Sequence, residues 1–350
     1  MLQQTQVKTV MPYWERWMRE LPTIASLAKA SPEKIHKLWE GLGYYTRVRN
    51  MQKAAQEIIA GRRRGDESQT NSESPHVVSY KFPETIDEVL ALPGIGRYTA
   101  GAICSIAFNQ PTPILDGNVI RVLTRIYGIS ENPREKETNA KLWTIAQQLV
   151  TDAAIGNRQS AIGNQKFPAC SHLNQSLMEL GALICTPRDP RCLLCPVSKH
   201  CFAFQNQRIN DFPNLDKRPT ATARRFAAFV VENDGNFLVR QRPAGVVNAH
   251  LWEFPNIELN SAPNDAASAA KELLGFIPKE IKPLCTIKHT ITRYRITVDA
   301  FRLNSAAAAR QSAANLHPHR WLPLSKLRKL SFPSAHKKIL NSLQPPARKS

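Results

Sequence analysis

The sequence predicts a chain of two parts, a mainly α-helical first part and a smaller α+β second part. Apolar residues recur every three to four positions through most of the first two hundred residues, which is typical of helices that bury one face. Four cysteines lie close together at the end of that part. From Arg225 onward, apolar and polar residues alternate around turn signals, as in β-hairpins. At 350 residues, the chain is long enough for two domains with separate cores.

The helical periodicity of the first part falls into separate stretches. Several open on good helix starts, such as Ser31-Pro32-Glu33, where the serine can cap free N–H groups. Two polar stretches, Arg62–Lys81 and Ile155–Cys170, interrupt the pattern and predict surface loops. The predicted helices are Val10–Glu20, Ile24–Ala30, Pro32–Trp39, Arg47–Ala60, Ile86–Ala91, Arg97–Phe108, Val119–Tyr127 and Lys141–Val150.

The second part has the pattern of a small α+β domain. Phe226–Val231 and Phe237–Arg242 flank the turn Asn233-Asp-Gly235, which predicts a β-hairpin. Further elements are expected in three places, as strands at Tyr294–Leu303 and Arg320–Leu322 and as a helix at Ala266–Leu274. The predicted boundaries are a helical domain at 1–209, a linker at 210–224, an α+β domain at 225–342 and a tail at 343–350.

The chain is strongly basic, with a net charge of +19 and a pI of about 9.9. This charge predicts a polyanionic partner, most commonly nucleic acid, although a solubilising surface is the alternative. No apolar run approaches the ~18 residues that cross a membrane, so we expect no membrane association. No signal peptide precedes the chain, which predicts a reducing compartment such as the bacterial cytoplasm.

The four clustered cysteines are Cys185, Cys192, Cys195 and Cys201, with the spacing C-x6-C-x2-C-x5-C. Zinc sites with four cysteine ligands usually pair two short knuckles across a longer spacer. One short knuckle flanked by gaps of six and five residues favours a cubane 4Fe-4S cluster. Zinc remains open on spacing alone, and disulfides are disfavoured in a reducing compartment.

A glycine-rich turn lies between two predicted helices, in Leu92-Pro93-Gly94-Ile95-Gly96-Arg97. Two glycines two positions apart allow a tight turn whose backbone N–H groups point outward at the start of the next helix. Such a turn can hold a DNA phosphate. The sequence therefore predicts a helix-hairpin-helix over about 86–108, with an ordinary turn between helices as the alternative.

Asp116 lies between the apolar pair Ile114-Leu115 and the next predicted helix. An aspartate in this position can be a simple helix cap. Because it follows the hairpin and its helix, it can also face the groove where a flipped nucleotide lies. A carboxylate there can stabilise a positively charged sugar as a base departs.

Five segments together resemble the A/G-specific adenine DNA glycosylases, the MutY family of the endonuclease III superfamily. They are Met1–Val7, Gly41–Arg47, the glycine-rich turn, Asp116–Asn118 and the cysteine loop. The resemblance covers Met1–Cys201, and extends more loosely over 225–340 from Leu251-Trp-Glu-Phe-Pro255. It implies a helix-hairpin-helix glycosylase domain with an iron–sulfur loop at 185–201, then a Nudix-like recognition domain.

The resemblance also implies the activity and the catalytic residues. The family removes adenine from double-stranded DNA that carries A:8-oxoguanine or A:G mispairs, and we expect a monomer. Asp116 would stabilise the oxocarbenium-like sugar, and Asn118 and Tyr98 would hold that carboxylate and the flipped nucleotide. Enzymes of the superfamily that also cut the strand carry a lysine at the position of Tyr98, so a monofunctional glycosylase is expected.

The DNA contacts that the resemblance implies lie in several segments. Gln175 matches a position that contacts the extruded adenine, and other residues wedge into the base stack beside the oxidised guanine. The family has Phe-Ser-His in the loop that reads oxoguanine, and this chain has Ile291, Thr292 and Arg293 there. Two alternatives stay open. Either these residues alter the discrimination of oxoguanine, or they form an ordinary strand edge. The expected wedge and backbone-binding residues are Gln4, Leu42, Tyr44, Gly94, Gly96 and Arg97.

One catalytic position of the family has no counterpart in this sequence. The family's general-acid glutamate stands two residues before Met1 of Met-Leu-Gln-Gln-Thr, and its loss costs ~10²–10⁴-fold in rate. Two hypotheses stay open, a start codon farther upstream or a degenerate mismatch-binding protein without catalysis. A Nudix pyrophosphatase is disfavoured, because Ala266–Gly275 offers one glutamate where that activity needs a metal-binding cluster.

Overall fold

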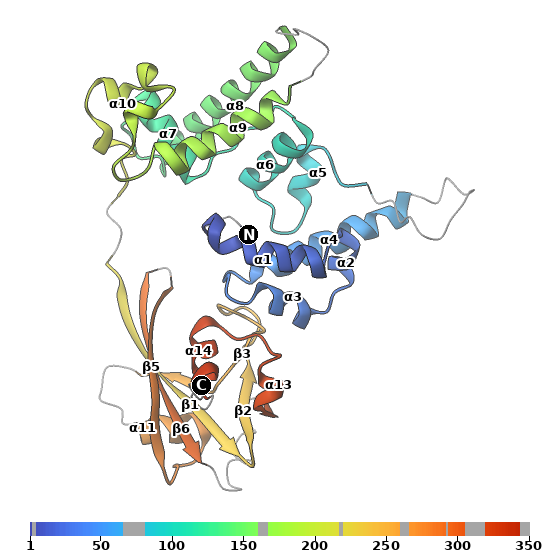
Figure 1. The fold of residues 1–350 in the computed structure, drawn as a ribbon, viewed down its shortest axis with the longest axis vertical. Coiled ribbons are helices and arrows are strands. Elements are labelled where there is room, and N and C mark those ends of the chain that lie inside the picture. Colours follow the sequence, from blue (N-terminus) through green and yellow to red (C-terminus); the bar gives the residue numbers. More distant parts are fainter. Residues whose placement is uncertain are drawn as a thin grey trace, which may run out of the picture. The chain divides into compact units, whose positions relative to one another are not determined.

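The computed structural model describes residues 1, 5–65, 81–159, 167–216, 220–259, 266–291, 293–304 and 319–343 (Figure 1). These residues form two compact units. The composite unit joins Met1–Ile59 to Pro219–Ser350, and the helical unit is Ala60–Arg218. The first 59 residues therefore group with the C-terminal part, whereas the sequence placed them with the other helices. The predicted domain boundaries stay a prediction.

The composite unit begins with helices that share one core. These N-terminal helices are α1 (Val7–Glu20), α2 (Ile24–Lys29), α3 (Pro32–Trp39) and the first part of α4 (Thr46–Gly65). Serine and threonine caps start two of them, since the side chains of Thr23 and Ser31 accept hydrogen bonds from first-turn amides. The rings of Trp17 and Trp39 meet edge to face at 5.7 Å in the centre of the core.

The rest of the composite unit is a sheet domain, residues 220–343, built on a seven-stranded mixed sheet. Strands β3, β2, β1, β6 and β5 follow one another in that order, β4 pairs with β1, and β7 pairs with β2. The pairing of β1 with β6 is parallel, and the others are antiparallel. The strands are β1 (Thr222–Asn233), β2 (Asn236–Gln241), β3 (Trp252–Glu253), β4 (Asn256–Glu258), β5 (Ile281–Ile291), β6 (Tyr294–Asn304) and β7 (His319–Pro323).

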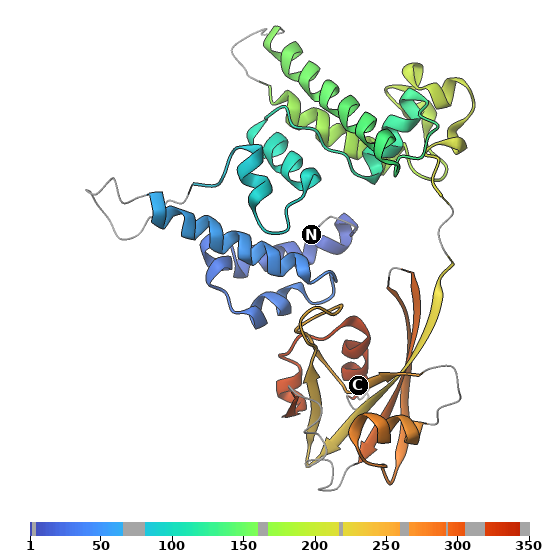
Figure 2. The ribbon, with the colours of Figure 1, turned by 180° about the vertical axis from the view of Figure 1, so that it is seen from behind.

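Each face of the sheet is covered by helices, because successive strand residues point to opposite faces. Ala227, Phe229 and Val231 of β1 pack with α11 (Ala266–Leu274). Ala228 and Val230 pack on the other face with α13 (Leu324–Leu327) and α14 (Ser334–Ser342). Figure 2 shows the sheet with α11 seen from behind. The predicted α+β domain is thus confirmed, and the predicted hairpin and α11 lie where the sequence places them.

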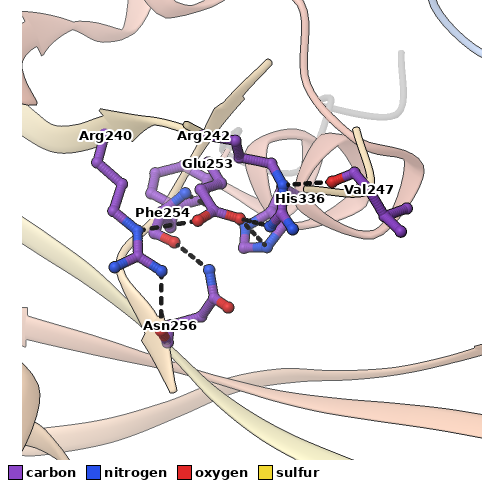
Figure 3. Close-up of polar contacts among 7 residues, drawn as sticks. All are labelled: Arg240, Arg242, Val247, Glu253, Phe254, Asn256 and His336. Atoms are coloured by element: carbon purple, nitrogen blue, oxygen red, sulfur yellow. Dashed lines mark hydrogen bonds and ion pairs between the residues drawn. The ribbon is translucent and has the colours of Figure 1, made fainter. Parts of the chain in front are cut away.

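A buried carboxylate on β3 lies at the centre of a polar cluster (Figure 3). Glu253 is 2% exposed, accepts a hydrogen bond from Arg240 Nε at 2.8 Å, and forms an ion pair with Arg242. Burial alone would raise its pKa, but the neighbouring cations hold the pKa below its usual value. His336 Nδ1 accepts the Phe254 N–H at 3.2 Å, which fixes the neutral imidazole in this position.

The stability of the composite unit should fall in acid because of His336. Burial lowers the pKa of this imidazole to about 4, despite the opposing charge of Glu253. Between pH ~6.5 and ~4 the His336 imidazole is protonated in the unfolded chain and neutral in the folded chain. The free energy of unfolding therefore falls by up to about 3 kcal/mol as the pH is lowered through this range. Denaturation measured across this pH range should lose about half of the slope in His336→Gln, because burial also lowers the pKa of His36 on α3 to about 4, and it should keep the full slope in the exposed His172→Gln. An equal slope in both variants would contradict the assignment.

The helical unit carries the hairpin and the cysteine loop. Its helices pack around the buried residues Ile114, Val119, Leu123 and Leu142. None of the helices in the described part of the chain is both long and apolar enough to cross a membrane. The elements are α5 (Ile86–Ala91), α6 (Arg97–Phe108), α7 (Gly117–Tyr127), α8 (Lys136–Gln159), α9 (Ala169–Glu179), η1 (Leu180–Ile184), η2 (Cys192–Leu194), η3 (Ser198–His200), α10 (Phe202–Gln205) and η4 (Ile209–Asp211).

The two predicted loops of the first part are shorter in the structure. Helix α8 continues to Gln159 and α4 to Gly65, so the prediction of a loop was wrong over 155–159 and 62–65. Gly156 costs a helix about 1 kcal/mol, but extending a helix that is already formed needs no new nucleation, so the helix continues past it. Residues 66–80 and 160–166 lie outside the described part of the chain.

Candidate active site and metal centre

The glycine-rich turn joins α5 to α6 as the sequence predicts. Gly94 has a φ of 76°, a conformation that favours glycine, and the Ile95 N–H closes the turn on Leu92 O at 3.2 Å. Gly96 caps α6 without a side chain, and Gly94, Gly96 and Arg97 are all exposed. The Arg97 guanidinium lies 3.9 Å from the centre of the Trp143 ring. The start of α6 thus presents backbone and a cation to solvent, as phosphate binding requires.

Asp116 is held in one orientation at the start of α7. Its Oδ1 accepts the N–H groups of Asn118 and Val119 at 2.9 and 2.8 Å. Its Oδ2 accepts the Asn118 side-chain amide at 3.2 Å. The half-buried carboxylate therefore caps the helix at the positive end of its dipole. This geometry is compatible with both interpretations of Asp116 from the sequence, a helix cap and a carboxylate that faces a flipped nucleotide.

Tyr98, on the first turn of α6, lies within electrostatic reach of Asp116. Burial and then the charge of Asp116 raise the pKa of this phenol, so it stays protonated at neutral pH. The hydroxyl contacts Met178 Sδ on α9 at 3.6 Å. The structure thus brings together the three residues predicted for catalysis, Tyr98, Asp116 and Asn118.

Arg121, on the next turn of α7, was missed by sequence reasoning. This 9%-exposed guanidinium donates from Nη2 to Asn118 Oδ1 at 2.9 Å and to Gly181 O at 2.7 Å. From Nε it donates to Cys185 O at 2.7 Å. Gly181 must be small, because a Cβ there would lie 2.7 Å from Asn118 Cβ. Arg121 therefore joins the side chain that holds Asp116 to the backbone of the first cysteine.

Arg125 lies one turn further along the same helix face and is 3% exposed. It donates to Cys185 Sγ at 3.4 Å, to Thr186 O at 2.8 Å and to Phe212 O at 3.1 Å. A sequence signal could have found both arginines. Arg121 and Arg125 are four residues apart among apolar residues of a helix, and this spacing places them on one buried face.

The four cysteines line one cavity of about 400 Å³, a volume that includes space open to solvent. Its other walls are mainly apolar, from Val122, Ile126, Leu180, Ile184, Val197, Phe204 and Ile209. All four are free thiols. Burial and then the neighbouring cysteines raise the pKa of Cys192, while Arg125 opposes this effect. Four thiolates can share this cavity only around a cation that offsets their repulsion.

The donor chemistry of this cavity fits an iron–sulfur cluster. Among the residues that the structure describes, no group of three cysteine, histidine or carboxylate side chains is already arranged to hold a metal ion. Four cysteines around one cavity with mainly apolar walls are the ligand set of a cubane cluster, and zinc uses the same ligands.

The predicted DNA contacts are divided between the two units. Gln175 is exposed on α9, and its amide donates to Ser171 Oγ at 3.0 Å. In the composite unit, Leu42 is partly buried against the N-terminal helices, and Tyr44 is 54% exposed. Gln4 and Thr292 lie outside the described residues. The roles of all these residues stay predictions.

Residues 1–148 match the family model of the HhH-GPD superfamily base excision DNA repair proteins, and residues 227–342 match the NUDIX domain. The adenine DNA glycosylase of Rattus norvegicus is 33% identical, over 97% of this chain and 69% of that protein. The adenine DNA glycosylase of Arabidopsis thaliana is 35% identical, over 82% of this chain and 46% of that protein.

A solved structure of a thermostable thymine-DNA glycosylase is 23% identical, covers 59% of this chain and 80% of its own, and has a TM-score of 0.44. The chain spans about half of the plant relative and about two thirds of the rat relative. The two family models match in the order that the sequence predicts, and the curated relatives match nearly the whole chain. The chain belongs to the adenine DNA glycosylase family, whose members are base-excision repair hydrolases of N-glycosyl bonds.

Proposed function

We propose that this chain hydrolyses the N-glycosidic bond of adenine paired with 8-oxoguanine or guanine in double-stranded DNA, without cutting the strand. The observation that carries this proposal is the Asp116 carboxylate, fixed at the start of α7 beside Tyr98 in a chain of this family. The hairpin glycines and the net charge of +19 support DNA as the partner.

The Asp116 carboxylate carries a negative charge whose position is fixed before the reaction begins. As the bond to adenine breaks, the sugar becomes positively charged, and Asp116 stabilises that charge. Two amides and the Asn118 side chain hold the oxygens, so little reorganisation accompanies the reaction. The Arg121 guanidinium donates to Asn118 Oδ1, and this hydrogen bond keeps the Asn118 and Asp116 side chains in their orientation while DNA binds.

The residue at position 98 supports a single activity. Strand cleavage by this superfamily uses an amine that attacks the sugar carbon, and tyrosine has none. Because the pKa of Tyr98 is raised, the phenol is a hydrogen-bond donor and not an anionic nucleophile. It can orient the flipped nucleotide against Asp116.

We also propose that Cys185, Cys192, Cys195 and Cys201 hold a 4Fe-4S cluster. When bound, the cluster crosslinks the loop and supplies positive charge to four thiolates. The chain contributes the apolar walls that exclude water and the Arg125 hydrogen bond to Cys185. Iron analysis of protein purified without oxygen should give about four irons per chain; zinc without iron would contradict the proposal.

A single-turnover assay tests the activity. Enzyme in excess over labelled duplex is expected to release adenine opposite 8-oxoguanine fastest, opposite guanine more slowly, and opposite thymine hardly at all. The strand should break only after alkali. Binding to the same duplexes is measured in parallel, because binding without release would favour the non-catalytic mismatch-binding hypothesis. Strand breaks without alkali would contradict the monofunctional assignment.

A further inference from the structure

The segment Gly41–Tyr45, which joins α3 to α4, is rigid. Gly41, Gly43 and Tyr44 have positive φ angles of 111°, 71° and 48°. The Trp39 indole donates to Gly43 O at 2.8 Å, and the Gly41 N–H donates to the Tyr45 hydroxyl at 3.3 Å. The exposed ring of Tyr44 stacks on Arg47, whose guanidinium lies 4.6 Å from the ring centre. This segment therefore presents Tyr44 to solvent in one conformation.

Glu40, the residue before this segment, ties the N-terminal helices to the sheet domain. Its side chain is 12% exposed and accepts the Phe332 N–H at 3.0 Å. It also pairs with Lys37 at 2.9 Å and with Lys337 of α14 at 3.2 Å. Lys37 in turn donates to Leu330 O at 2.8 Å. Glu40, Lys37, Lys337 and the Leu330–Phe332 backbone make up what we call the Glu40 clasp.

A second contact flanks the segment from the α4 side. Arg49 donates to Ala249 O at 3.1 Å, and Leu251 is fully buried among the N-terminal helices. The polar cluster of Figure 3 holds these residues in place, because Arg242 pairs with Glu253 and donates to Val247 O at 2.8 Å. The sheet domain thus contacts Glu40, just before the segment Gly41–Tyr45, and Arg49 of α4, four residues after it.

We infer that Glu40 is a positioning residue for mispair recognition, which makes discrimination by Leu42 and Tyr44 depend on docking of the sheet domain. The inference rests on the proposed function and on the family resemblance, which implies that these two side chains wedge beside the oxidised guanine. The segment Gly41–Tyr45 moves as one piece because its backbone is held by hydrogen bonds. If the Glu40 clasp loosens, Leu42 and Tyr44 therefore shift together relative to the sheet domain. The ion pairs of the clasp are only partly buried, since the side chains of Lys37 and Lys337 are 33% and 30% exposed, so we assign them to fixing one arrangement and not to stability.

The first experiment measures docking without any reaction. In Glu40→Gln, the side-chain oxygen can still accept the Phe332 N–H but no longer pairs with two lysines, and in Glu40→Ala both interactions are lost. Amide exchange at Phe332 should be slowest in the wild type, faster in Glu40→Gln and fastest in Glu40→Ala. Glu20→Gln is the matched control, since Glu20 pairs with Lys34 at 3.3 Å on the exposed end of α1.

The second experiment measures discrimination, as the ratio of single-turnover rates for adenine opposite 8-oxoguanine and opposite guanine. Glu40→Gln should lower this ratio about fivefold, a change within the range that substitutions along a coupled network produce. Lys337→Met should lower it similarly, and the double variant should add little, because both changes open the same clasp. Glu20→Gln should leave the ratio unchanged.

A purely structural role for Glu40 gives a different result, in which both rates fall together and the ratio holds. Faster exchange at Phe332 with an unchanged ratio would overturn the inference and leave the proposed function intact. The ratio is also measured for binding to the two duplexes. If the wild type released no adenine at all, the proposed function would fail, while the binding ratio would still decide whether Glu40 governs discrimination.

Discussion

Replacing Asp116 with asparagine is expected to slow adenine release ~10²–10³-fold while leaving folding and DNA binding nearly unchanged. Asparagine caps helices as well as aspartate does, and its oxygen can still accept the N–H groups of Asn118 and Val119. What disappears is the negative charge opposite the departing base. The measurements are single-turnover rates, duplex affinity and thermal unfolding of the same preparations.

The matched control is Asp152→Asn, which alters an exposed carboxylate on α8 that accepts a hydrogen bond from Gln148. It should release adenine at the wild-type rate. Wild-type release by Asp116→Asn would show that the carboxylate is only a helix cap. A loss of DNA affinity equal to the loss of rate would instead place Asp116 in binding.

Replacing Arg125 with methionine is expected to destabilise the helical unit by about 3 kcal/mol and to reduce the iron bound per chain. The change leaves the carbonyls of Thr186 and Phe212 without their donor in a buried place. It also removes the cation that donates to Cys185 Sγ. Iron content, visible absorbance and thermal unfolding measure the effect.

Arg134→Met is the control, because Arg134 is exposed after α7 and contacts none of the cysteines in the interactions described. Arg125→Lys separates charge from geometry, since lysine keeps the cation but lacks the planar fork that reaches several carbonyls. Full iron content and unchanged unfolding in Arg125→Met would show that the cysteine loop holds itself together without this helix.

Helix positions were predictable where the sequence carries explicit start signals. Ser31 caps α3 and the Thr85–Glu88 capping box starts α5, and both helices have the predicted bounds. Strand β5 escaped prediction because Pro283 and a register shift between Pro283 and Cys285 break its alternation. The irregular strand forms because its partner β6 pairs with it along its length.

The candidate site was predictable only in part. Asp116 lies in a short motif whose chemistry can be stated from the residues, whereas the roles expected of Asn118 and Tyr98 come from the family resemblance. Arg121 and Arg125 were missed, because a helical arginine is exposed by default and their carbonyl partners lie 60 or more positions away. The contact of Glu40 could not be predicted from the sequence, since the Phe332 amide that it binds is 292 positions away.

The burial of Leu251 among the N-terminal helices has a consequence for biosynthesis. A ribosome releases Trp17 and Trp39 long before Leu251, so the core that these residues share lacks this leucine while the chain is still short. The helical unit 60–218 contains its own core and can form in the meantime. Residues 1–59 therefore complete their core only after the chain has passed through the whole helical unit and into the sheet domain.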